Sequence, residues 1–590
     1  MPVAPPAVVP PVPRPGRLGW LAVLASLFAA LVYLNALDNP FIYDDFRTVL
    51  NNPSIEDVWA VEAIVYREMT RPVVNFSYAL DRAIWGGDVR GYHLTNVLLH
   101  VVNVLLLFQL ARRSVEDQQA RRASTTGCAQ PPIAVVAFTA AAAFGLHPIM
   151  TEAVGYISGR SEVLCGTFFL AALLSARRWL VGGGRGWLAA AFGLWICALL
   201  SKEIGAMWPL VLLAYDRLVL AGDRGAARRR WNRVLGPLLG LTLVAGLVRV
   251  GVLVLVENPG GADVIWRYGL VEVEVIFRYF ALLLSPGEQS VFHQVGDAGW
   301  PPRPRLVLAI PWLAAWLAAA WKIRRFDGAV SVGMLWFVLL LVPSSVLVLL
   351  NLGEPMAEHR VYLAAAGFFL AMGTVAGYVW ERLARGARRR GLLLRVTLAA
   401  WLTVLGGLTV LRNDVWSDPV RLWLDAAEKA PDIWVPHVML GSALQERGAL
   451  AGAIVAYRRA IALRPAETAP YMRLGLAQAE AGRLTEARST FQSLLGLDPT
   501  SAIGHNGLGA VAMLEGRHDE ARRHYEQALA HHPGDVASRQ SLAMLHETVW
   551  QNPAEALRLC AEVKAIAPRT PEIDACIERN RARLGGTSAR

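Results

Sequence analysis

GRLGWLAVLASLFAALVYLNALDNPFIYDDF occupies residues 16–46 and joins a long apolar run to a loop that carries two adjacent carboxylates. The run from Arg17 to Leu37 is about twenty residues long, which fits a bilayer span better than the short core of a cleavable signal. No small-residue cleavage site ends the run. We therefore expect a retained first membrane helix that leads directly into an acidic loop.

The composition indicates that this helix is one of many. The chain has 590 residues, of which 54% are hydrophobic and 18% charged, and its mean hydropathy is +0.37. Such values favour burial in a membrane. Apolar segments of spanning length recur, and we predict about eleven spans, at residues 18–37, 94–111, 132–146, 161–176, 187–200, 204–220, 234–256, 306–321, 329–350, 362–380 and 392–411.

The positive charges predict the orientation of these spans. The net charge is +11, but Lys and Arg lie mostly between apolar segments, which indicates membrane orientation rather than nucleic-acid binding. We read Trp266–Ser285, which carries Glu272, Glu274 and Arg278, as an interfacial or re-entrant helix. The Pro-rich residues 1–16 are then a disordered cytoplasmic tail, residues 17–412 a membrane domain, and the C-terminus external.

After the last span the sequence repeats with a period of 34, the length of a tetratricopeptide (TPR) unit. The repeated positions are Leu440-Gly441, Leu474-Gly475 and Leu508-Gly509, then Ala453, Ala487 and Ala521, then Tyr457, Phe491 and Tyr525, and finally Pro465, Pro499 and Pro533. A fourth unit follows after a one-residue slip. We predict a linker with half a repeat at 413–433, a TPR array at 434–570, and a cap and tail at 571–590.

TPR arrays stack into superhelices that bind peptides or proteins, so we assign this part no chemistry. A spacer without a ligand is the alternative. The five cysteines show no metal-ligand spacing, and Cys560 and Cys576 can pair only in an oxidising compartment.

The first candidate site is the pair Asp44 and Asp45. Carboxylates at the bilayer edge are costly unless they are solvated, paired or used, and one of them can act as a general base. An Asx turn or helix cap is the alternative.

Three further groups of ionisable residues lie in short outer loops. Each suggests a polar pocket in which the cation, Arg160, Lys202 or Arg360, binds a phosphate and the other residues support the pocket, and each has helix-end ion pairs as the alternative. A lone arginine within the span at 234–256 is a further lipid-phosphate candidate. The residues are His147, Glu152 and Arg160 in one loop, Lys202 and Glu203 in the next, Glu358, Arg360 and Tyr362 in the last, and Arg249 within the span. A divalent metal has no support from ligand spacing.

Taken together, these motifs resemble the transmembrane-plus-TPR protein O-mannosyltransferase-like family, which belongs to the GT-C superfamily. The resemblance also includes Asn39-Pro40-Phe41-Ile42-Tyr43, Arg71-Pro72 and Tyr92-His93-Leu94-Thr95-Asn96. It implies an all-α fold, a polyprenyl-phosphate-linked sugar as donor, and an acidic residue of the first outer loop as base. His359 stands where such proteins commonly have an aromatic residue or Leu.

We therefore expect an inverting glycosyltransferase of a bacterial inner membrane. It would transfer a mannose-like sugar to a hydroxyl group, such as that of a protein Ser or Thr, at the outer face, with the array in the periplasm. The first rival is a non-catalytic membrane scaffold whose function lies in the TPR array. A flippase or transporter is the third class, and it would need no acceptor base.

Overall fold

The computed structural model describes residues 18–122, 130–220, 224–252, 254–255, 268–295, 304–349, 354–384, 388–567 and 571–587. Within these ranges the regular structure is helical and contains no strand, which confirms the all-α prediction. The chain divides into two compact units, Met1–Asp418 and Pro419–Arg590. The boundary predicted after residue 412 falls inside the last helix of the first unit. The predicted disordered tail, residues 1–16, lies outside the described residues.

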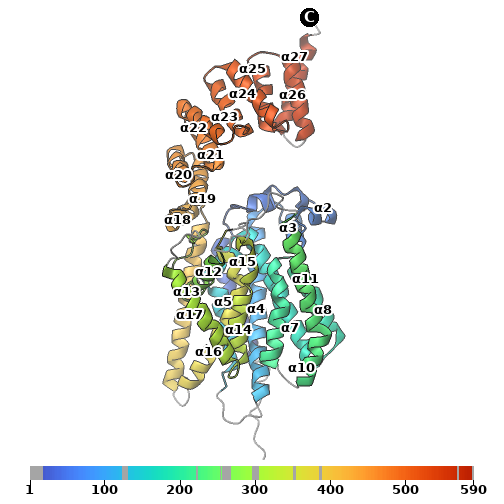
Figure 1. The fold of residues 1–590 in the computed structure, drawn as a ribbon, viewed down its shortest axis with the longest axis vertical. Helices are drawn as coiled ribbons and strands as arrows, with labels where there is room; N and C mark the ends of the chain where they lie inside the picture. Colours follow the sequence, from blue (N-terminus) through green and yellow to red (C-terminus); the bar gives the residue numbers. More distant parts are fainter. Residues whose placement is uncertain are drawn as a thin grey trace, which may run out of the picture. The chain divides into compact units, whose positions relative to one another are not determined.

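The first unit is a bundle in which long helices run side by side (Figure 1). Its helices are α1 (Gly19–Leu31), α2 (Val61–Arg67), α3 (Pro72–Trp85), α4 (Val89–Arg122), α5 (Ile133–Leu146), α6 (Thr151–Val154), α7 (Arg160–Gly182), α8 (Arg185–Leu199), α9 (Trp208–Tyr215), α10 (Arg224–Arg230), α11 (Gly236–Val252), α12 (Tyr268–Leu284), α13 (Pro304–Ile323), α14 (Gly328–Leu339), α15 (Val342–Leu349), α16 (Tyr362–Ala384) and α17 (Arg388–Trp416).

Eight helical segments of the described residues are long and apolar enough to cross a membrane, or nine if the bent pair α5–α6 is one span. The prediction of about eleven spans is therefore too high by this measure. Two of the predicted segments are helical but lack this character. Helix α8 has only 15 residues, whereas a span needs about twenty. Helix α9 has 8 residues and continues into a 3-10 helix before it and a π-helix after it, but this longer segment carries Glu203, Asp216 and Arg217, and charged residues are rare within spans.

Glycines allow the central helices to pack closely. A Cβ atom at Gly333 of α14 would lie 2.4 Å from the Gly367 carbonyl oxygen of α16, and one at Gly373 of α16 would lie 2.8 Å from the Val136 carbonyl oxygen of α5. Small residues at such crossings are typical of membrane helices. The close packing fixes the helix ends, and so it fixes the loops that carry the candidate site.

Helix α12 covers the segment that we predicted to be interfacial. It is not among the segments with spanning character, and Arg278 forms an ion pair with Glu274 one turn away, at 2.7 Å. The end of α12 reaches the loop before α16, where the Tyr279 hydroxyl donates to the Ala357 carbonyl oxygen at 2.6 Å. The membrane topology itself stays a prediction.

The second unit is an array of antiparallel helix pairs. Its helices are α18 (Pro419–Lys429), α19 (Trp434–Glu446), α20 (Leu450–Leu463), α21 (Thr468–Glu480), α22 (Leu484–Leu497), α23 (Ala502–Leu514), α24 (His518–His531), α25 (Val536–Thr548), α26 (Pro553–Ile566) and α27 (Pro571–Thr587). The repeated aromatics are buried beneath the repeated glycines. A Cβ atom at Gly475, for example, would lie 2.7 Å from the ring of Phe491.

A second glycine series at the same period ends the first helix of each pair. Gly448, Gly482 and Gly516 have φ of 74°, 72° and 75°, the left-handed conformation that commonly ends a helix. In the fourth unit Gln551 takes this position with φ of 48°, one residue later than the period predicts. The one-residue slip therefore lies in the turn between α25 and α26, because α25 has 13 residues like the first helix of the preceding unit. The last two helices are joined by a disulfide between Cys560 and Cys576.

Candidate active site

The two adjacent carboxylates of the first loop have different surroundings. Asp45 is 1% exposed. One of its oxygens accepts hydrogen bonds from the Ser158 N–H at 2.8 Å and the Ser158 hydroxyl at 2.6 Å, and the other accepts from the Ile42 N–H at 3.1 Å. Burial raises the pKa of Asp45 to about 7, although the hydrogen bonds from Ser158 and Ile42 lower it. Asp45 thus anchors the loop to the start of α7.

Asp44 is exposed. Its backbone N–H donates to the Tyr156 hydroxyl at 3.0 Å, which fixes the backbone, while its carboxylate has no hydrogen bond or ion pair within the described ranges. The preceding residue, Tyr43, has φ of 54°. A large side chain rarely adopts this left-handed conformation, and such strain is concentrated at functional sites. The loop therefore holds the Asp44 carboxylate in solvent.

A second acidic residue, Glu354, lies close enough to Asp44 for their charges to interact. Burial raises the pKa of Glu354 to about 7, and the negative charges of Glu152 and Asp44 add to this effect, whereas Arg360 opposes it. The Arg360 guanidinium also donates to the Glu354 carbonyl oxygen at 2.6 Å. Arg360, on the turn before α16, is thereby held beside the first loop.

Glu152 and Glu358 are structural supports of the turn that carries Arg360. Glu152 is 5% exposed and Glu358 is 2% exposed. The Glu152 carboxylate accepts the Glu358 N–H at 3.0 Å and contacts His359 Nδ1 at 2.6 Å. Glu358 in turn accepts the Ser290 N–H at 2.7 Å, just beyond α12. Both carboxylates are thus engaged within the protein.

Two further predicted residues point into the bundle. His147 is fully buried, accepts the Ile149 N–H at 3.2 Å on Nδ1, and contacts the Leu283 carbonyl oxygen at 3.1 Å through Nε2. The Tyr362 hydroxyl lies 2.8 Å from His100 Nδ1 and accepts from the Asn103 amide at 2.9 Å. Both residues support the site and lie away from solvent.

Lys202 and Glu203 each take a partner from another element. Lys202 Nζ lies 2.7 Å from Glu162 at the start of α7, and Glu203 lies 3.2 Å from Arg71. Burial acts to raise the pKa of Glu203, but the charges of Arg71 and Lys202 outweigh it and lower the pKa to about 2. The charges of Lys202, Arg71 and Arg360 also reach His359. These cations therefore lie around His359, and Arg360 links them to Glu354 and the first loop.

Arg160 has a different environment from the one that we predicted. It is 0% exposed, forms an ion pair with Asp81 at 2.6 Å, and donates to the Asn96 side chain at 2.7 Å and the Tyr92 carbonyl oxygen at 2.8 Å. These bonds join α3, α4 and α7. The Arg160 guanidinium therefore holds α3, α4 and α7 together and does not face solvent. The Arg249 side chain lies outside the described part of the structure.

The structure thus brings Asp44, Lys202 and Arg360 to one end of the bundle. It adds three residues that the sequence analysis did not assign a role, namely Arg71, His359 and Arg412. Arg71 lies in the Arg71-Pro72 motif, and Arg412 directly follows the last predicted span, is 7% exposed and lies close enough to interact with Glu152. A search for charges at the ends of the apolar runs would have found Arg412. Among the described residues, no group of three or more His, Cys, Asp or Glu side chains has the arrangement of a metal site.

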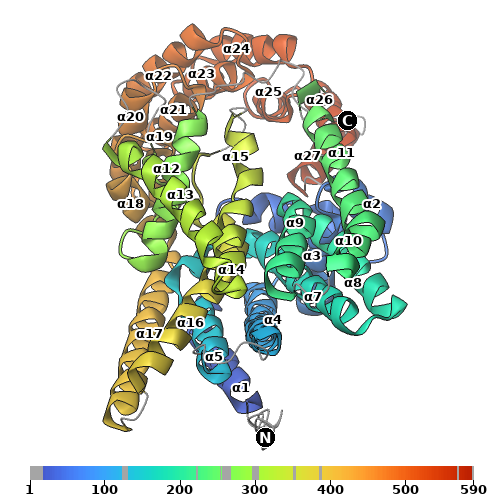
Figure 2. The same ribbon diagram turned by 60° about the horizontal axis from the view of Figure 1, so that its bottom comes forward.

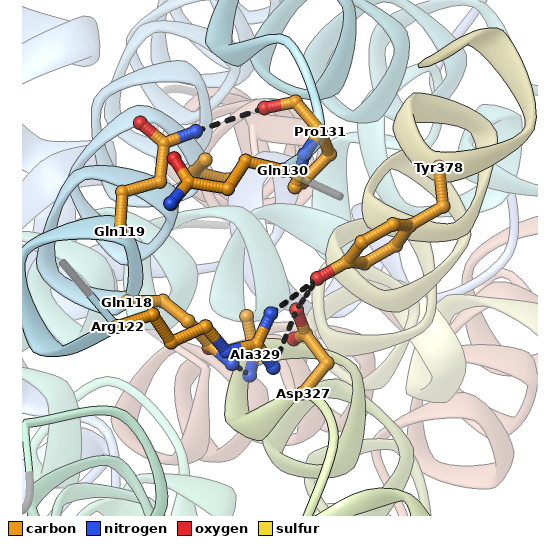
Figure 3. A pocket seen from close by; sticks show the side chains of 9 residues that line it. Gln118, Gln119, Arg122, Gln130, Pro131, Asp327, Ala329 and Tyr378 are labelled. Atoms are coloured by element: carbon orange, nitrogen blue, oxygen red, sulfur yellow. Dashed lines mark hydrogen bonds and ion pairs between the residues drawn. The ribbon is translucent and has the colours of Figure 1, made fainter. Parts of the chain in front are cut away.

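A small pocket near the other end of α4 has a structural role (Figure 3). Its volume is about 10 Å³, which is room for roughly one water molecule. The Arg122 guanidinium donates to the Tyr378 hydroxyl at 2.7 Å, and that hydroxyl donates to Asp327 at 2.7 Å. Asp327 also accepts the Val330 N–H at 3.0 Å and so caps α14. The network joins α4, α14 and α16.

Comparison with protein families identifies the second unit. Tetratricopeptide-repeat profiles match residues 438–502 and 512–577. The C-terminal helices are TPR repeats. The TPR array also resembles solved structures, among them MamA (21% identity, 25% of this chain and 81% of that chain, TM-score 0.22) and a thermophilic TPR protein of Thermus thermophilus (23% identity, 32% and 96%, TM-score 0.26).

The similarity to curated proteins extends from the TPR array into the membrane unit. Protein O-mannosyl-transferase Tmtc1 of Drosophila melanogaster is 26% identical over 75% of this chain and 61% of its own length. Protein O-mannosyl-transferase F38B6.6 of Caenorhabditis elegans is 24% identical over 76% and 63%, and human TMTC1 is 24% identical over 76% and 55%. The chain thus spans about three fifths of the length of these relatives. The resemblance inferred from the sequence motifs is confirmed.

Proposed function

We propose that this chain is a membrane glycosyltransferase that transfers a sugar from a polyprenyl-phosphate carrier to a hydroxyl group of a protein. The observation that carries the proposal is the exposed Asp44 carboxylate at the end of the bundle that also holds Lys202 and Arg360. The names of the similar proteins support protein O-mannosylation. Nucleotide sugars are confined to the cytoplasm, so transfer at the outer face needs a lipid-linked donor.

In the proposed reaction the acceptor oxygen attacks the anomeric carbon while the bond from that carbon to the phosphate oxygen breaks. Asp44 takes the proton of the acceptor hydroxyl, and the electron pair of the broken bond leaves with polyprenyl phosphate. A single displacement of this kind inverts the anomeric configuration. General base catalysis of this kind contributes about 10²- to 10⁴-fold to the rate.

Cationic side chains would stabilise the charge that develops on the leaving phosphate. Arg360 and Lys202 are the candidates from the prediction, and Arg71 is added by the structure. Lys202 and Arg71 are held by Glu162 and Glu203, which keeps them oriented without a ligand. Arg160 acts indirectly, because its bonds to Asp81 and Asn96 fix the helices around the site.

The substitution Asp44→Asn tests the base. Membranes that contain the full-length chain are supplied with polyprenyl-phosphate mannose carrying a radioactive sugar, and label incorporated into protein is counted. Because the amide keeps the shape and loses the basicity, we expect transfer to fall by about 10²-fold or more.

The matched control is Glu62→Gln, which neutralises an exposed carboxylate of the same loop on α2 and should leave transfer unchanged. Full activity of Asp44→Asn together with loss of activity in Asp45→Asn would move the base to Asp45. Absence of transfer by the unmodified chain from this donor would contradict the proposed donor.

A further inference from the structure

An apolar groove runs along the bundle between α1, α5 and α17. Its volume is about 1070 Å³. Leu24 and Phe28 of α1, Phe138 of α5 and Leu402 of α17 are among the residues that line it. Helix α5 lies between the other two, which is visible when the bundle is seen from its lower end (Figure 2). The groove is lined mostly by apolar side chains and has room for a hydrocarbon chain.

Arg395 is the one charged residue among those that line this groove. It is exposed, and it makes no ion pair with any residue in the described ranges. An arginine without a partner on an apolar membrane surface is costly unless its guanidinium reaches an anion or water. The groove therefore combines an apolar surface for a hydrocarbon chain with the cation of Arg395, which has no anionic partner in the described ranges.

The arginine lies at the end of the groove where a lipid head group would be expected. Trp20 of α1 and Trp380 of α16 line the groove near the same end, and tryptophan is enriched at the membrane–water interface. From Arg395 the groove follows α17 to Val410, a distance of about 22 Å at 1.5 Å per residue. This is longer than one leaflet's hydrocarbon, which is about 15 Å, and it suits an extended acyl chain.

We propose that the groove binds one anionic phospholipid of the leaflet nearer to Arg395, with its phosphate on the Arg395 guanidinium and an acyl chain along α17. A phosphate matches the fork of arginine donors. The polyprenyl-phosphate donor fits less well, because its phosphate is proposed to bind Lys202 and Arg360 and would leave Arg395 without an anion. A membrane helix from a second copy would leave Arg395 without an anion.

Gly407 provides a way to fill the groove without disturbing the protein. A Cβ atom at Gly407 would meet no atom within 4 Å, whereas one at the neighbouring Gly406 would lie 3.3 Å from Val32. Gly407→Leu therefore places its side chain in the groove. The matched control is Gly193→Leu on α8, where a Cβ atom also meets nothing and the groove is absent.

The test measures the lipid that stays bound to the full-length chain. The protein is purified from nanodiscs with equal amounts of phosphatidylglycerol and phosphatidylethanolamine, and retained lipids are counted by native mass spectrometry. We expect the unmodified chain to retain phosphatidylglycerol. Arg395→Gln should lower this retention about tenfold, the effect of losing one charged hydrogen bond. Arg389→Gln makes the same change in charge at an exposed arginine outside the groove and should retain the lipid.

Gly407→Leu should lower the retention of both phospholipids, and Gly193→Leu should not. If Gly407→Leu fails to fold, Thr403→Leu fills the same groove. Equal retention of phosphatidylglycerol by Arg395→Gln and the unmodified chain would overturn the proposal. So would retention of polyprenyl phosphate in place of phospholipid, or a dimer that Gly407→Leu dissociates.

Discussion

Asp44 and Asp45 show how far neighbouring residues can differ in role. The sequence identifies the pair and its place after the first span, but it does not distinguish the two. The distinction depends on Ser158, which lies 113 positions away and donates twice to Asp45. The sequence also did not show that Arg160 is buried, because its ion-pair partner, Asp81, comes from another helix. Residue types at a membrane edge are visible in a sequence, whereas long-range pairing is not.

The pKa of Asp45 leads to a prediction about stability. Its folded-state pKa of about 7 lies above the ordinary value of 3.8, so the folded protein holds this proton more tightly than the unfolded chain does. The stabilisation from this group is complete below pH 3.8 and is lost as pH rises to about 7. Asp45→Asn removes the titration.

We therefore expect the Tm of the unmodified chain to fall, relative to that of Asp45→Asn, as pH rises from about 4 to 7, and to fall no further above that range. Thermal unfolding in detergent, followed by tryptophan fluorescence, measures both curves. Glu62→Gln, at an exposed carboxylate of α2, serves as the control and should keep the slope of the unmodified chain. A constant difference between the unmodified chain and Asp45→Asn at every pH would contradict the assigned burial of Asp45.

At the scale of elements, the repeats were the most predictable part of the fold. Each TPR unit uses the same local contacts, so a period of 34 determines the helix pairs and the glycine positions. The one-residue slip in the sequence marks the longer turn at Gln551. The membrane helices were predictable in position but not in number. An apolar run such as 204–220 reads as one regular span, yet it folds as a short α-helix, α9, between a 3-10 helix and a π-helix.

Two glycines of the array predict opposite effects of the same substitution. At Gly475 a Cβ atom would lie 2.7 Å from the Phe491 ring, whereas at Gly496 it would meet nothing. Gly475→Ala should destabilise the array by about 1–3 kcal/mol through overpacking. Gly496→Ala, in the helix α22, should stabilise it by about 0.5–1 kcal/mol.

Hydrogen exchange of the α21 and α22 amides in the full-length chain measures both changes. Faster exchange is expected for Gly475→Ala and slower exchange for Gly496→Ala. The same direction of change in both variants would show that the ring of Phe491 does not limit the space above Gly475.

At the scale of the whole molecule, the path of the chain predicts that Asp44 and the TPR array lie in the same compartment. Helix α17 ends at Trp416, whose ring packs on Tyr156 with centroids 5.5 Å apart, and Tyr156 accepts the Asp44 N–H. The array begins at Pro419, so the chain leaves the membrane unit on the side of Asp44. The disulfide Cys560–Cys576 favours an oxidising compartment for this side.

We predict that the C-terminus is periplasmic in a bacterial inner membrane. An alkaline phosphatase fused after residue 590 should be active, and the same enzyme fused after Arg122, in the loop predicted to be cytoplasmic, should be inactive. Blocking of free thiols before reduction should leave Cys560 and Cys576 unlabelled. An inactive C-terminal fusion would reverse the proposed topology and place Asp44 in the cytoplasm.

The bond between Cys560 and Cys576 also affects how the array comes apart. In a stack where each repeat touches only its neighbours, terminal repeats lack one neighbour and fray first. Here a covalent link ties α26 to α27, the last two helices of the described array. Separation of these two helices is therefore suppressed as long as the bond is intact.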